Sequence, residues 1–526
     1  MRFMSTLSLL QSKIYSLCSV VLLPLVSACS TMPFNSDRYP VQEATISSVQ
    51  NDISSLDLTC VGLIDEYIDR IEKYDQPTKL NAIIMINPRA RERARQLDQN
   101  FYSNYPLKPL HCVPVILKDN FDTADMPTAA GSMVLKDSYP PDDAFMVKRL
   151  RDAGAIIIAK SNMAEWAFSP YHTISSTMGE TRNPYDLQRV PAGSSGGTAA
   201  AVAANFGLVG MGSDTGNSIR GPSSHAALVG MRSTIGATSR DGVVPLVLNR
   251  DVAGPMTRTV EDNARIFSII AGYDPADPVT KDSVGKIPAT FHENLSIHAL
   301  KGKRIGVLRA LSDTETADPE TKALFTAAIQ DLKRLGAEII DPFKINKLDE
   351  LMKATGFCSR FRYDINNYFA SLGDKAPVQK LSQIVEAKNY LEISQGAMDW
   401  AMSVNIAPEQ QDPPCVDVQG DPRRKALLDA VVAAMDKQSV DALVYPSWNN
   451  PPRLIGDLES PHGNNSPLIA PHSGQPAITV PMGFVAGQLP VGLQILGRPY
   501  SEALLYQLAY AYEQGSLHRR PPKQFP

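Results

Sequence analysis

The sequence predicts an α/β protein built around one large domain, and three observations support this fold class. Apolar strands and amphipathic helices alternate along most of the 526 residues. Hydrophobic residues make up 43% and charged residues 20% of the chain, which is typical of a folded enzyme with a large core. No long Gly/Ser-rich or Pro-rich linker divides its centre, although a chain of this length could hold two or three domains. One large α/β unit is therefore the simplest interpretation.

The first 28 residues predict an export signal of the lipoprotein type. Arg2 and Lys13 are its only charges, and an apolar run over 14–25 is too short to span a bilayer comfortably. Small residues then lead into Cys29, as in the lipobox of bacterial lipoproteins. We expect Cys29 to be acylated, so that a lipid anchor attaches the protein to a membrane of the bacterial cell envelope. A plain signal peptide, with a periplasmic product, and an uncleaved anchor are the alternatives.

The N-terminal half of the body shows the alternation clearly. Apolar residues at helical spacing predict helices, and uninterrupted apolar runs such as VPVIL and AIIIA predict buried strands. In chain order, these patterns predict a helix over 60–74, a charged helix after Pro88, a strand over 113–117 that ends at Lys118, a helix over 144–152 and a strand over 155–159.

The same alternation continues in the C-terminal half. It predicts, in order, a helix over 259–271, a strand over 304–308, a helix over 319–335, strands over 337–340, 441–447, 476–481 and 491–497, and a final helix over 501–514. The pattern weakens over 341–422, which is rich in aromatic and turn residues, so we expect a lid or substrate-specific insertion there. Residues 29–48 are expected to form a tether and residues 517–526 a C-terminal tail.

Composition limits the partners and cofactors. A formal net charge of −4 offers no basic surface for nucleic acid, so we expect no such partner. Besides Cys29, the mature chain holds Cys60, Cys112, Cys358 and Cys415, whose spacing selects none of the three possible pairings. We expect buried free thiols with one disulfide at most. No Cys/His cluster has the spacing of a metal site, so neither a metal nor another cofactor is expected. The oligomeric state stays open.

The first of two glycine-rich clusters is GSSGG at 193–197. It fits the GxSxG nucleophile elbow with Ser195 as nucleophile, and His462 or His472 could then serve as the base. That elbow follows a strand, whereas the residues before Gly193 have the composition of a loop. The match to a phosphate-binding loop is weaker still, because no GK[ST] follows the glycines. Both interpretations are disfavoured.

The second cluster, DTGNSIR over 214–220, is better suited to nucleophilic catalysis. Ser218 would lie at the tip of a tight turn. The backbone N–H groups ahead of it would converge on one point and could stabilise an oxyanion. These N–H groups belong to Thr215, Gly216, Asn217 and Ser218.

These segments and others resemble the amidase signature family of serine hydrolases. The matching motifs are KDN at 118–120, AGSSGGTAAAVA at 192–203, SDTGNSIRGP at 213–222, LVGMRST at 228–234, VAGPMTRTVED at 252–262, and GQPAITVPMGF and LPVGLQILG near the C-terminus. The resemblance implies a single catalytic domain over 49–516, with a central mixed sheet of many strands covered by helices on both faces.

The resemblance also implies roles for three residues. Ser218 would be the nucleophile, Ser194 a bridging serine that follows a cis peptide bond, and Lys118 the terminal base. A serine hydroxyl is a weak nucleophile and must pass on its proton. Lys118 can accept that proton only when neutral, so burial must lower its pKa from an ordinary value of about 10.4 to roughly 7 to 8.

Neighbouring residues are expected to support this site. Asp214 and Arg220 would brace the nucleophile turn through an ion pair or hydrogen bonds, and Ser195 would assist through its hydroxyl or N–H. Most family members carry glycine where this chain has Asn217. Its N–H is retained, but we expect its side chain to occupy part of the acyl pocket.

The resulting hypothesis is an amidase that cleaves a carboxamide of a small-molecule substrate through an acyl-enzyme intermediate. One alternative is the glutaminase subunit of a tRNA-dependent amidotransferase, although that enzyme works in the cytoplasm. The other is an envelope lipoprotein that keeps the fold without catalysis. The sequence does not indicate which amide is cleaved.

Overall fold

A computed structural model describes residues 39–103 and 105–526, and residues 39–526 form one compact unit. The predicted signal peptide, Cys29 and the first part of the predicted tether lie outside the described residues. Within those ranges, no helix combines the length and apolar character needed to cross a membrane.

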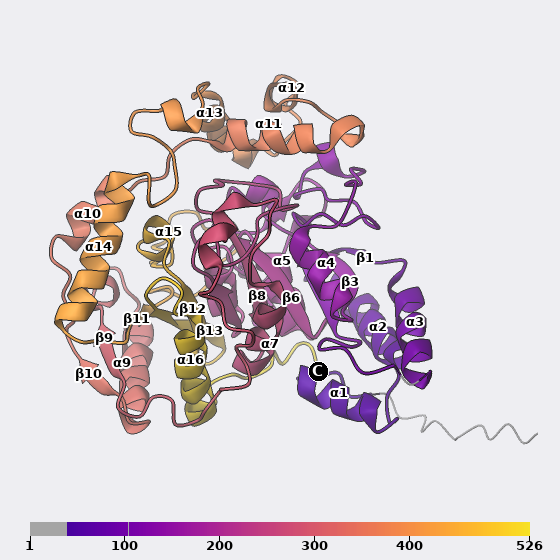
Figure 1. Cartoon of the computed structure of the whole chain (residues 1–526), viewed down its shortest axis with the longest axis horizontal. Coiled ribbons are helices and arrows are strands. Elements are labelled where there is room, and N and C mark those ends of the chain that lie inside the picture. Colours follow the sequence, from indigo (N-terminus) through magenta and orange to yellow (C-terminus); the bar gives the residue numbers. More distant parts are fainter. Residues whose placement is uncertain (1–38, 104) are drawn as a thin grey trace, which may run out of the picture. The chain divides into compact units, whose positions relative to one another are not determined.

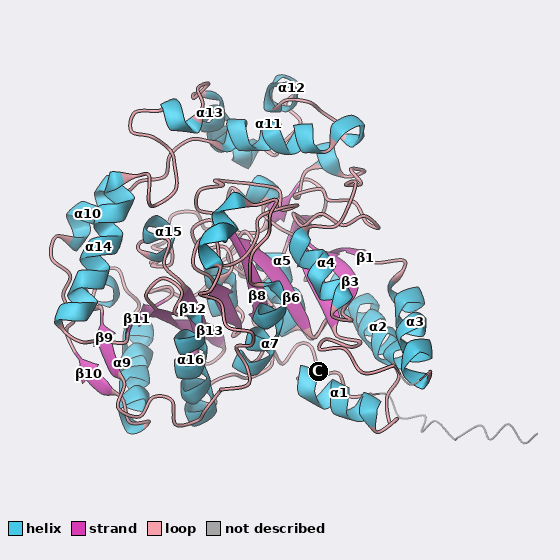
Figure 2. Ribbon diagram, viewed as in Figure 1, coloured by secondary structure: helices cyan, strands magenta, loops and turns pink. Residues whose placement is uncertain are grey.

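The unit is organised around an 11-stranded mixed sheet (Figures 1 and 2). Its strands follow the order β1-β3-β2-β6-β8-β7-β12-β13-β11-β9-β10. Their bounds are β1 Ile83–Ile86, β2 Pro114–Lys118, β3 Ile156–Ser161, β6 Val209–Asp214, β7 Val229–Arg232, β8 Val252–Thr257, β9 Arg304–Val307, β10 Glu338–Ile340, β11 Ala442–Pro446, β12 Ala477–Val485 and β13 Leu489–Leu496. A second sheet pairs β4 Ile174–Ser175 with β5 Gly179–Glu180. The predicted α/β fold class is confirmed.

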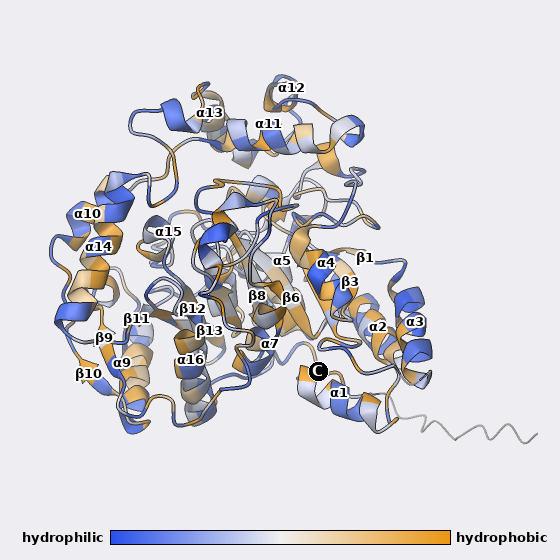
Figure 3. Ribbon diagram, in the orientation of Figure 1, coloured by the Kyte–Doolittle hydropathy of each residue, from blue (hydrophilic) through white to orange (hydrophobic). Residues whose placement is uncertain are grey.

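Helices cover both faces of the large sheet. Those of the main body are α1 Ile46–Ser54, α2 Cys60–Thr78, α3 Ala90–Tyr102, α4 Phe145–Asp152, α5 Gly196–Ala203, α6 Arg220–His225, α7 Val260–Ile270, α8 Arg309–Ser312, α9 Pro319–Arg334, α14 Pro422–Lys437, α15 Ala470–Ser473 and α16 Glu502–Ser516. On β6, Gly210 lies so close to α5 that an added Cβ would meet the Thr198 side chain at 2.5 Å. α5 also packs on β2, and α7 packs on β8 and β7. The outer helix α3 is largely hydrophilic (Figure 3).

Strand pairing sets the position of the site. β2 lies between β3 and β6 and is parallel to both, with Leu117 opposite Met211. Lys118 at the end of β2 therefore lies beside the end of β6, from which the turn carrying Ser218 begins. Parallel neighbours thus bring a base and a nucleophile candidate, distant in sequence, to the same sheet edge.

The 341–422 insertion is helical and packs on the body. It contains α10 Leu348–Ala354, α11 Phe361–Ser371, α12 Leu381–Glu386 and α13 Gln395–Met402, and the last three lie in a layer over one side of the main unit (Figure 1). Its apolar side chains share a cluster with residues of the body, including Trp166 and Val244.

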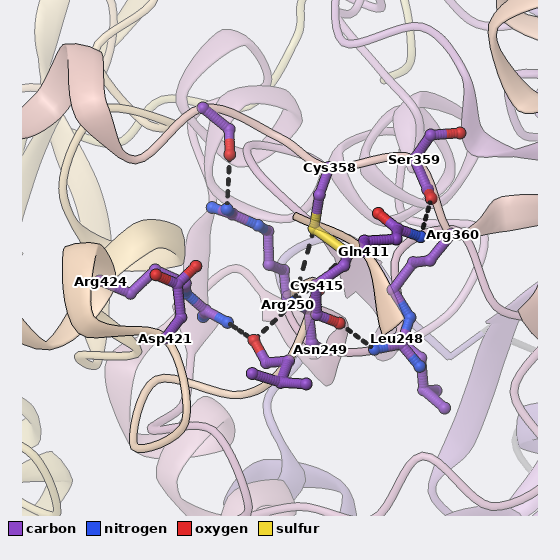
Figure 4. The surroundings of a disulfide bond; sticks show 12 residues. Leu248, Asn249, Arg250, Cys358, Ser359, Arg360, Gln411, Cys415, Asp421 and Arg424 are labelled. Atoms are coloured by element: carbon purple, nitrogen blue, oxygen red, sulfur yellow. Dashed lines mark hydrogen bonds between the residues drawn. A yellow bond between two sulfur atoms is a disulfide. The ribbon is translucent and has the colours of Figure 1, made fainter. Parts of the chain in front are cut away.

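Two disulfides replace the free thiols that the sequence favoured. Cys60 at the start of α2 is bonded to Cys112, and Cys358 is bonded to Cys415 across the insertion. Asn249 of the body donates from Nδ2 to the Val416 carbonyl at 2.7 Å, so the second disulfide lies where insertion and body meet (Figure 4). The expectation of at most one disulfide was wrong, because both pairs come together only through tertiary packing.

The ends of the described chain also differ from expectation. Val41, Ala44 and Ile46 are buried, so the part of the predicted tether from residue 39 onward packs on the core. In the predicted tail, Phe525 is buried and Arg519 forms an ion pair with Glu43 at 2.7 Å. Both terminal segments therefore belong to the folded unit.

Candidate active site

Lys118 is fully buried at the end of β2 and is held by two hydroxyl groups. Its Nζ lies 2.7 Å from Ser194 Oγ and 2.8 Å from Ser213 Oγ. Burial lowers the pKa of Lys118 from 10.5 to about 7, although the carboxylates of Asp214 and Asp251 oppose this shift. Near neutral pH, a large fraction of Lys118 is therefore an uncharged amine that can accept a proton.

Ser194 lies on a loop that leads into α5. The Gly193–Ser194 peptide bond is cis, as the family resemblance implies. Gly193 fits against the carbonyl oxygens of His172 and Ser169, which an added Cβ would meet at 2.4 and 2.5 Å. This close approach requires glycine and brings Ser194 to the base of the site.

Ser218 lies on the turn between β6 and α6 and lines a pocket. Its hydroxyl makes no hydrogen bond with Ser194 or Lys118, both of which are described. The two loops are nevertheless joined, because the Ser195 N–H donates to the Ser218 carbonyl at 3.3 Å. The structure thus brings Lys118 and Ser194 into direct contact and places Ser218 beside them.

The nucleophile turn leaves its backbone donors free. Among the described residues, none accepts a hydrogen bond from the N–H of Thr215, Gly216, Asn217 or Ser218, and all four residues line the pocket. Unpaired N–H groups of consecutive residues can hold a negatively charged oxygen. This geometry can stabilise an oxyanion.

Asp214 and Arg220 form a fully buried ion pair behind this turn. Asp214 Oδ2 accepts the Ile219 N–H at 3.1 Å and Arg220 Nε at 3.2 Å, and Arg232 Nη1 donates to Oδ1 at 2.9 Å. Burial alone would raise the pKa of Asp214, but the guanidinium groups of Arg220 and Arg232 lower it to about 2. Arg220 Nη2 also donates to the Gly216 carbonyl at 2.8 Å. These bonds fix the shape of the turn.

The sequence analysis assigned no role to Ser213, Asn120 or Arg232. Asn120 Nδ2 donates to Ser213 Oγ at 3.0 Å, and Ser213 in turn contacts Lys118. Asn120 and Ser213 both lie within the family motifs KDN and SDTGNSIRGP, and this position in the motifs could have indicated that they belong to the site. Ser195, expected to assist, donates from Oγ to the Ser213 carbonyl at 3.2 Å.

Protein groups engage the side-chain amide of Asn217. The residue is only 2% exposed, and both amide hydrogens and the amide oxygen have hydrogen-bond partners. Asn217 also lines the pocket, so the expectation that its side chain takes up part of the acyl pocket stays a prediction.

The nucleophile-elbow alternative is not supported by the histidines. His462 contacts the Tyr171 hydroxyl through Nε2 at 3.3 Å, and His472 contacts the Arg250 guanidinium. Neither imidazole forms a hydrogen bond with Ser195, so no Ser-His pair exists at this loop.

The pocket above Ser218 has a volume of about 420 Å³ and is mainly apolar. No Asp, Glu, Lys or Arg is among the described residues that line it. They are Ala167, Phe168, Pro170, Tyr171, Thr215, Gly216, Asn217, Ser218, Leu246, Val247, Phe357, Ala397, Trp400, His462, Asn464, Pro467 and Leu468. Phe357, Ala397 and Trp400 come from the 341–422 insertion, which therefore shapes the pocket as a substrate-specific element would.

In the described part of the chain, one cluster has metal-ligating atoms close together. It comprises Cys60, His111 and Cys112, whose ligand atoms lie within 4.8 Å of one another. Because the two cysteines are bonded to each other, their sulfur atoms are not thiolate ligands. The site around Ser218 contains no comparable cluster of described residues.

Known proteins are similar to this chain both in sequence and in fold. The amidase family model matches residues 62–506. The chain belongs to the amidase family. This amidase is 32% identical to a probable amidase of Arabidopsis thaliana over 93% of each chain. It is 31% identical to one subunit of the glutamyl-tRNA(Gln) amidotransferase of Prochlorococcus marinus, over 90% of this chain and 97% of that protein. The crystal structure of native peptide amidase from Stenotrophomonas maltophilia is similar, with a TM-score of 0.82 and 34% identity over 93% of this chain and 99% of that one.

Proposed function

We propose that this amidase hydrolyses uncharged carboxamides through an acyl-enzyme on Ser218. The observation that carries the proposal is a buried Lys118 with a pKa of about 7, hydrogen-bonded to Ser194 beneath the pocket that Ser218 lines. A neutral amine in this position can serve as the base that a serine nucleophile needs.

In the proposed reaction, Ser218 Oγ attacks the carbonyl carbon and gives its proton to Ser194 Oγ, while Ser194 passes its own proton to Lys118 Nζ. The free N–H groups of residues 215–218 stabilise the oxyanion. When the C–N bond breaks, the proton returns from Lys118 through Ser194 to the departing amine nitrogen. Water then attacks the ester by the same route, which releases the acid and restores Ser218.

This route requires the Ser218 hydroxyl to turn toward Ser194 Oγ when substrate binds. Catalytic hydrogen bonds are often long or misaligned without substrate and form in the bound complex. The Ser195 N–H to Ser218 carbonyl bond already holds the two loops together.

The pocket indicates the substrate class. A cavity of about 420 Å³ without a charged lining side chain suits an apolar or aromatic acyl group. Peptide amides with an apolar terminal residue fit this description, and one similar structure is a peptide amidase. Free glutamine, the amide donor of the amidotransferase alternative, would bring an ammonium and a carboxylate into the pocket without a charged partner. The pocket therefore favours hydrolysis of apolar amides over that alternative.

We also propose that the protein is exported and anchored through an acylated Cys29. Disulfides persist in oxidising compartments, and the body holds two of them, Cys60–Cys112 and Cys358–Cys415. Labelling of envelope lipoproteins with a radioactive fatty acid tests this proposal. Incorporation should occur in the wild-type chain and disappear in Cys29→Ala; a chain that remains unlabelled in the envelope would contradict acylation.

Hydrolysis of an amide panel tests the catalytic proposal. We expect the purified protein to release ammonia from benzamide and N-acetylphenylalaninamide, which are both uncharged, much faster than from glutamine, and to react with a fluorophosphonate at Ser218. Ser218→Ala should lose both properties. Ser223→Ala, which removes a buried hydroxyl that has no hydrogen-bond partner among the described residues, should keep them. A wild-type protein inert toward both the amides and the fluorophosphonate would support the non-catalytic lipoprotein alternative.

A further inference from the structure

The Asn217 side chain links three segments that surround the nucleophile. Its Nδ2 donates to the Gly193 carbonyl at 2.8 Å and to the Pro170 carbonyl at 3.2 Å, while its Oδ1 accepts from Trp448 Nε1 at 3.1 Å. Both amide hydrogens and the amide oxygen therefore have partners. Gly193 immediately precedes Ser194, and Asn217 immediately precedes Ser218. The amide thus spans the two loops that carry the serines.

The chemistry of these partners fixes the orientation of the amide. Carbonyl oxygens only accept hydrogen bonds, and an indole N–H only donates. A reversed amide would place its oxygen against the two carbonyls and its NH2 group against the Trp448 donor. Only one orientation satisfies all three contacts, so Asn217 holds the Gly193 carbonyl at a defined distance from the nucleophile turn.

The surroundings form a built slot for this amide. An added Cβ at Gly221 would meet Asn217 Oδ1 at 2.2 Å, so a residue with a side chain at position 221 would displace it. Trp448 is itself held in place, because its ring lies 4.6 Å from the His225 ring and meets the Tyr171 ring edge-on at 6.2 Å between centroids. Trp448 thus provides a donor that cannot easily move, and Gly221 leaves the space that the Asn217 oxygen occupies.

We infer that Asn217 is a positioning residue, which fixes the Ser218 turn relative to Ser194 and depends on Trp448 to do so. This inference rests on the proposed function. Ser194 is already bound to Lys118, whereas Ser218 forms no hydrogen bond with either residue, so the approach of the two hydroxyls depends on how the loops are held. Asn217 acts on the transition from bound substrate to acyl-enzyme. Its amide groups are already engaged by protein partners.

Asn263 offers a matched control far from the nucleophile. It is also buried, its Nδ2 donates to the Val229 and Pro255 carbonyls at 3.1 Å each, and its Oδ1 accepts from the Tyr506 hydroxyl at 2.8 Å. Asn263→Ala and Tyr506→Phe therefore remove the same kinds of hydrogen bond as Asn217→Ala and Trp448→Phe. A purely structural role would make the two pairs behave alike.

The test measures kcat, KM and thermal unfolding for these variants with an apolar amide. Asn217→Ala should lower kcat by about tenfold to a hundredfold with KM within about threefold, since orientation of reacting groups contributes at least this much. Trp448→Phe should lower kcat by about threefold to tenfold, and it should have no further effect in the Asn217→Ala background. The pH midpoint of kcat/KM should stay unchanged, because the contacts of Lys118 are intact. The Asn263 and Tyr506 variants should lower the melting temperature and leave kcat within about twofold.

Several outcomes would overturn the inference while the proposed function stands. These are an unchanged kcat in Asn217→Ala or Trp448→Phe, a raised KM with unchanged kcat, and an equal loss of kcat in Asn263→Ala. If Asn217→Ala does not fold, Trp448→Phe decides the question. If the wild-type protein neither hydrolyses amides nor reacts with a fluorophosphonate at Ser218, the proposed function fails and this inference fails with it.

Discussion

Replacing Ser213 by alanine should shift the pH dependence of hydrolysis in a direction that the structure specifies. Ser213 Oγ lies 2.8 Å from Lys118 Nζ and accepts a second hydrogen bond from Asn120 Nδ2 at 3.0 Å. As an acceptor, it stabilises the ammonium form of Lys118 more than the neutral amine. Its removal should lower the pKa of Lys118, and the alanine should also leave Nζ less well directed toward Ser194.

The magnitude follows from hydrogen-bond energetics. A bond to a charged group contributes about 1 kcal/mol more than one between neutral groups, and about 1.36 kcal/mol corresponds to one pKa unit. In the wild type, Lys118 must be neutral to act, so kcat/KM should rise with pH through a midpoint near its pKa of about 7. Between pH 6 and pH 8 this corresponds to a rise of roughly tenfold. In Ser213→Ala, the midpoint should fall by somewhat less than one pH unit, and the high-pH plateau should fall by about tenfold.

The assay is kcat/KM for an apolar amide between pH 5 and pH 9 in a buffer of constant ionic strength. Ser223→Ala is the control and should reproduce the wild-type curve, because within residues 39–103 and 105–526 the buried Ser223 hydroxyl has no hydrogen-bond partner. A midpoint that moves upward in Ser213→Ala would refute the reasoning. So would a wild-type profile without a rise near neutral pH, because Lys118 would then not be the titrating base.

Three further predictions concern the nucleophile, the second disulfide and the pocket mouth. Ser218→Ala and Lys118→Ala should each lower kcat by at least about 10³-fold without a change in melting temperature, and near-normal turnover in either would contradict the assignment. The double variant Cys358→Ser/Cys415→Ser removes the disulfide between two residues that are 57 apart in the sequence. In urea titrations, the free energy of unfolding of this variant should fall by up to about 4 kcal/mol. An unchanged value would show that the disulfide does not restrict the conformations of the unfolded chain. Trp400→Lys brings a charge to the apolar mouth, so KM for N-acetylphenylalaninamide should rise by about tenfold with kcat within twofold, whereas an unchanged KM would place the acyl group elsewhere.

Much of the site was predictable because its chemistry needs particular residue types in particular local contexts. Lys118 follows an apolar strand, and Ser194 and Ser218 stand in glycine-rich turns, but their roles were implied by the motifs that resemble the amidase signature family. The ion pair of Asp214 and Arg220 was also expected. Such features depend on neighbours along the chain, which a single sequence displays directly.

Other parts of the fold gave no local signal. β6, β7 and β8 lie in the middle of the sheet, yet the glycine-rich run that forms β6 shows neither apolar alternation nor a β-branched stretch. Every residue of β6 is buried, so the strand has no solvent-exposed face that polar side chains would mark in the sequence. The amphipathic helices and apolar strands such as β2, β3 and β11, by contrast, appeared close to their predicted positions, whereas the short edge strand β1 was not predicted.

By itself, the sequence determined the fold class and the family, because periodicity and motifs are properties of short segments, and the resemblance of those motifs to the family implied the three residues proposed for catalysis. The tertiary structure alone decided the two disulfide pairings, the apolar wall that the insertion adds to the pocket, and the contacts of Ser213 with Lys118 and of Trp448 with Asn217. Those contacts join segments far apart in the chain. Which residues meet depends on which surfaces the whole fold buries against each other, and a local sequence pattern does not contain that information.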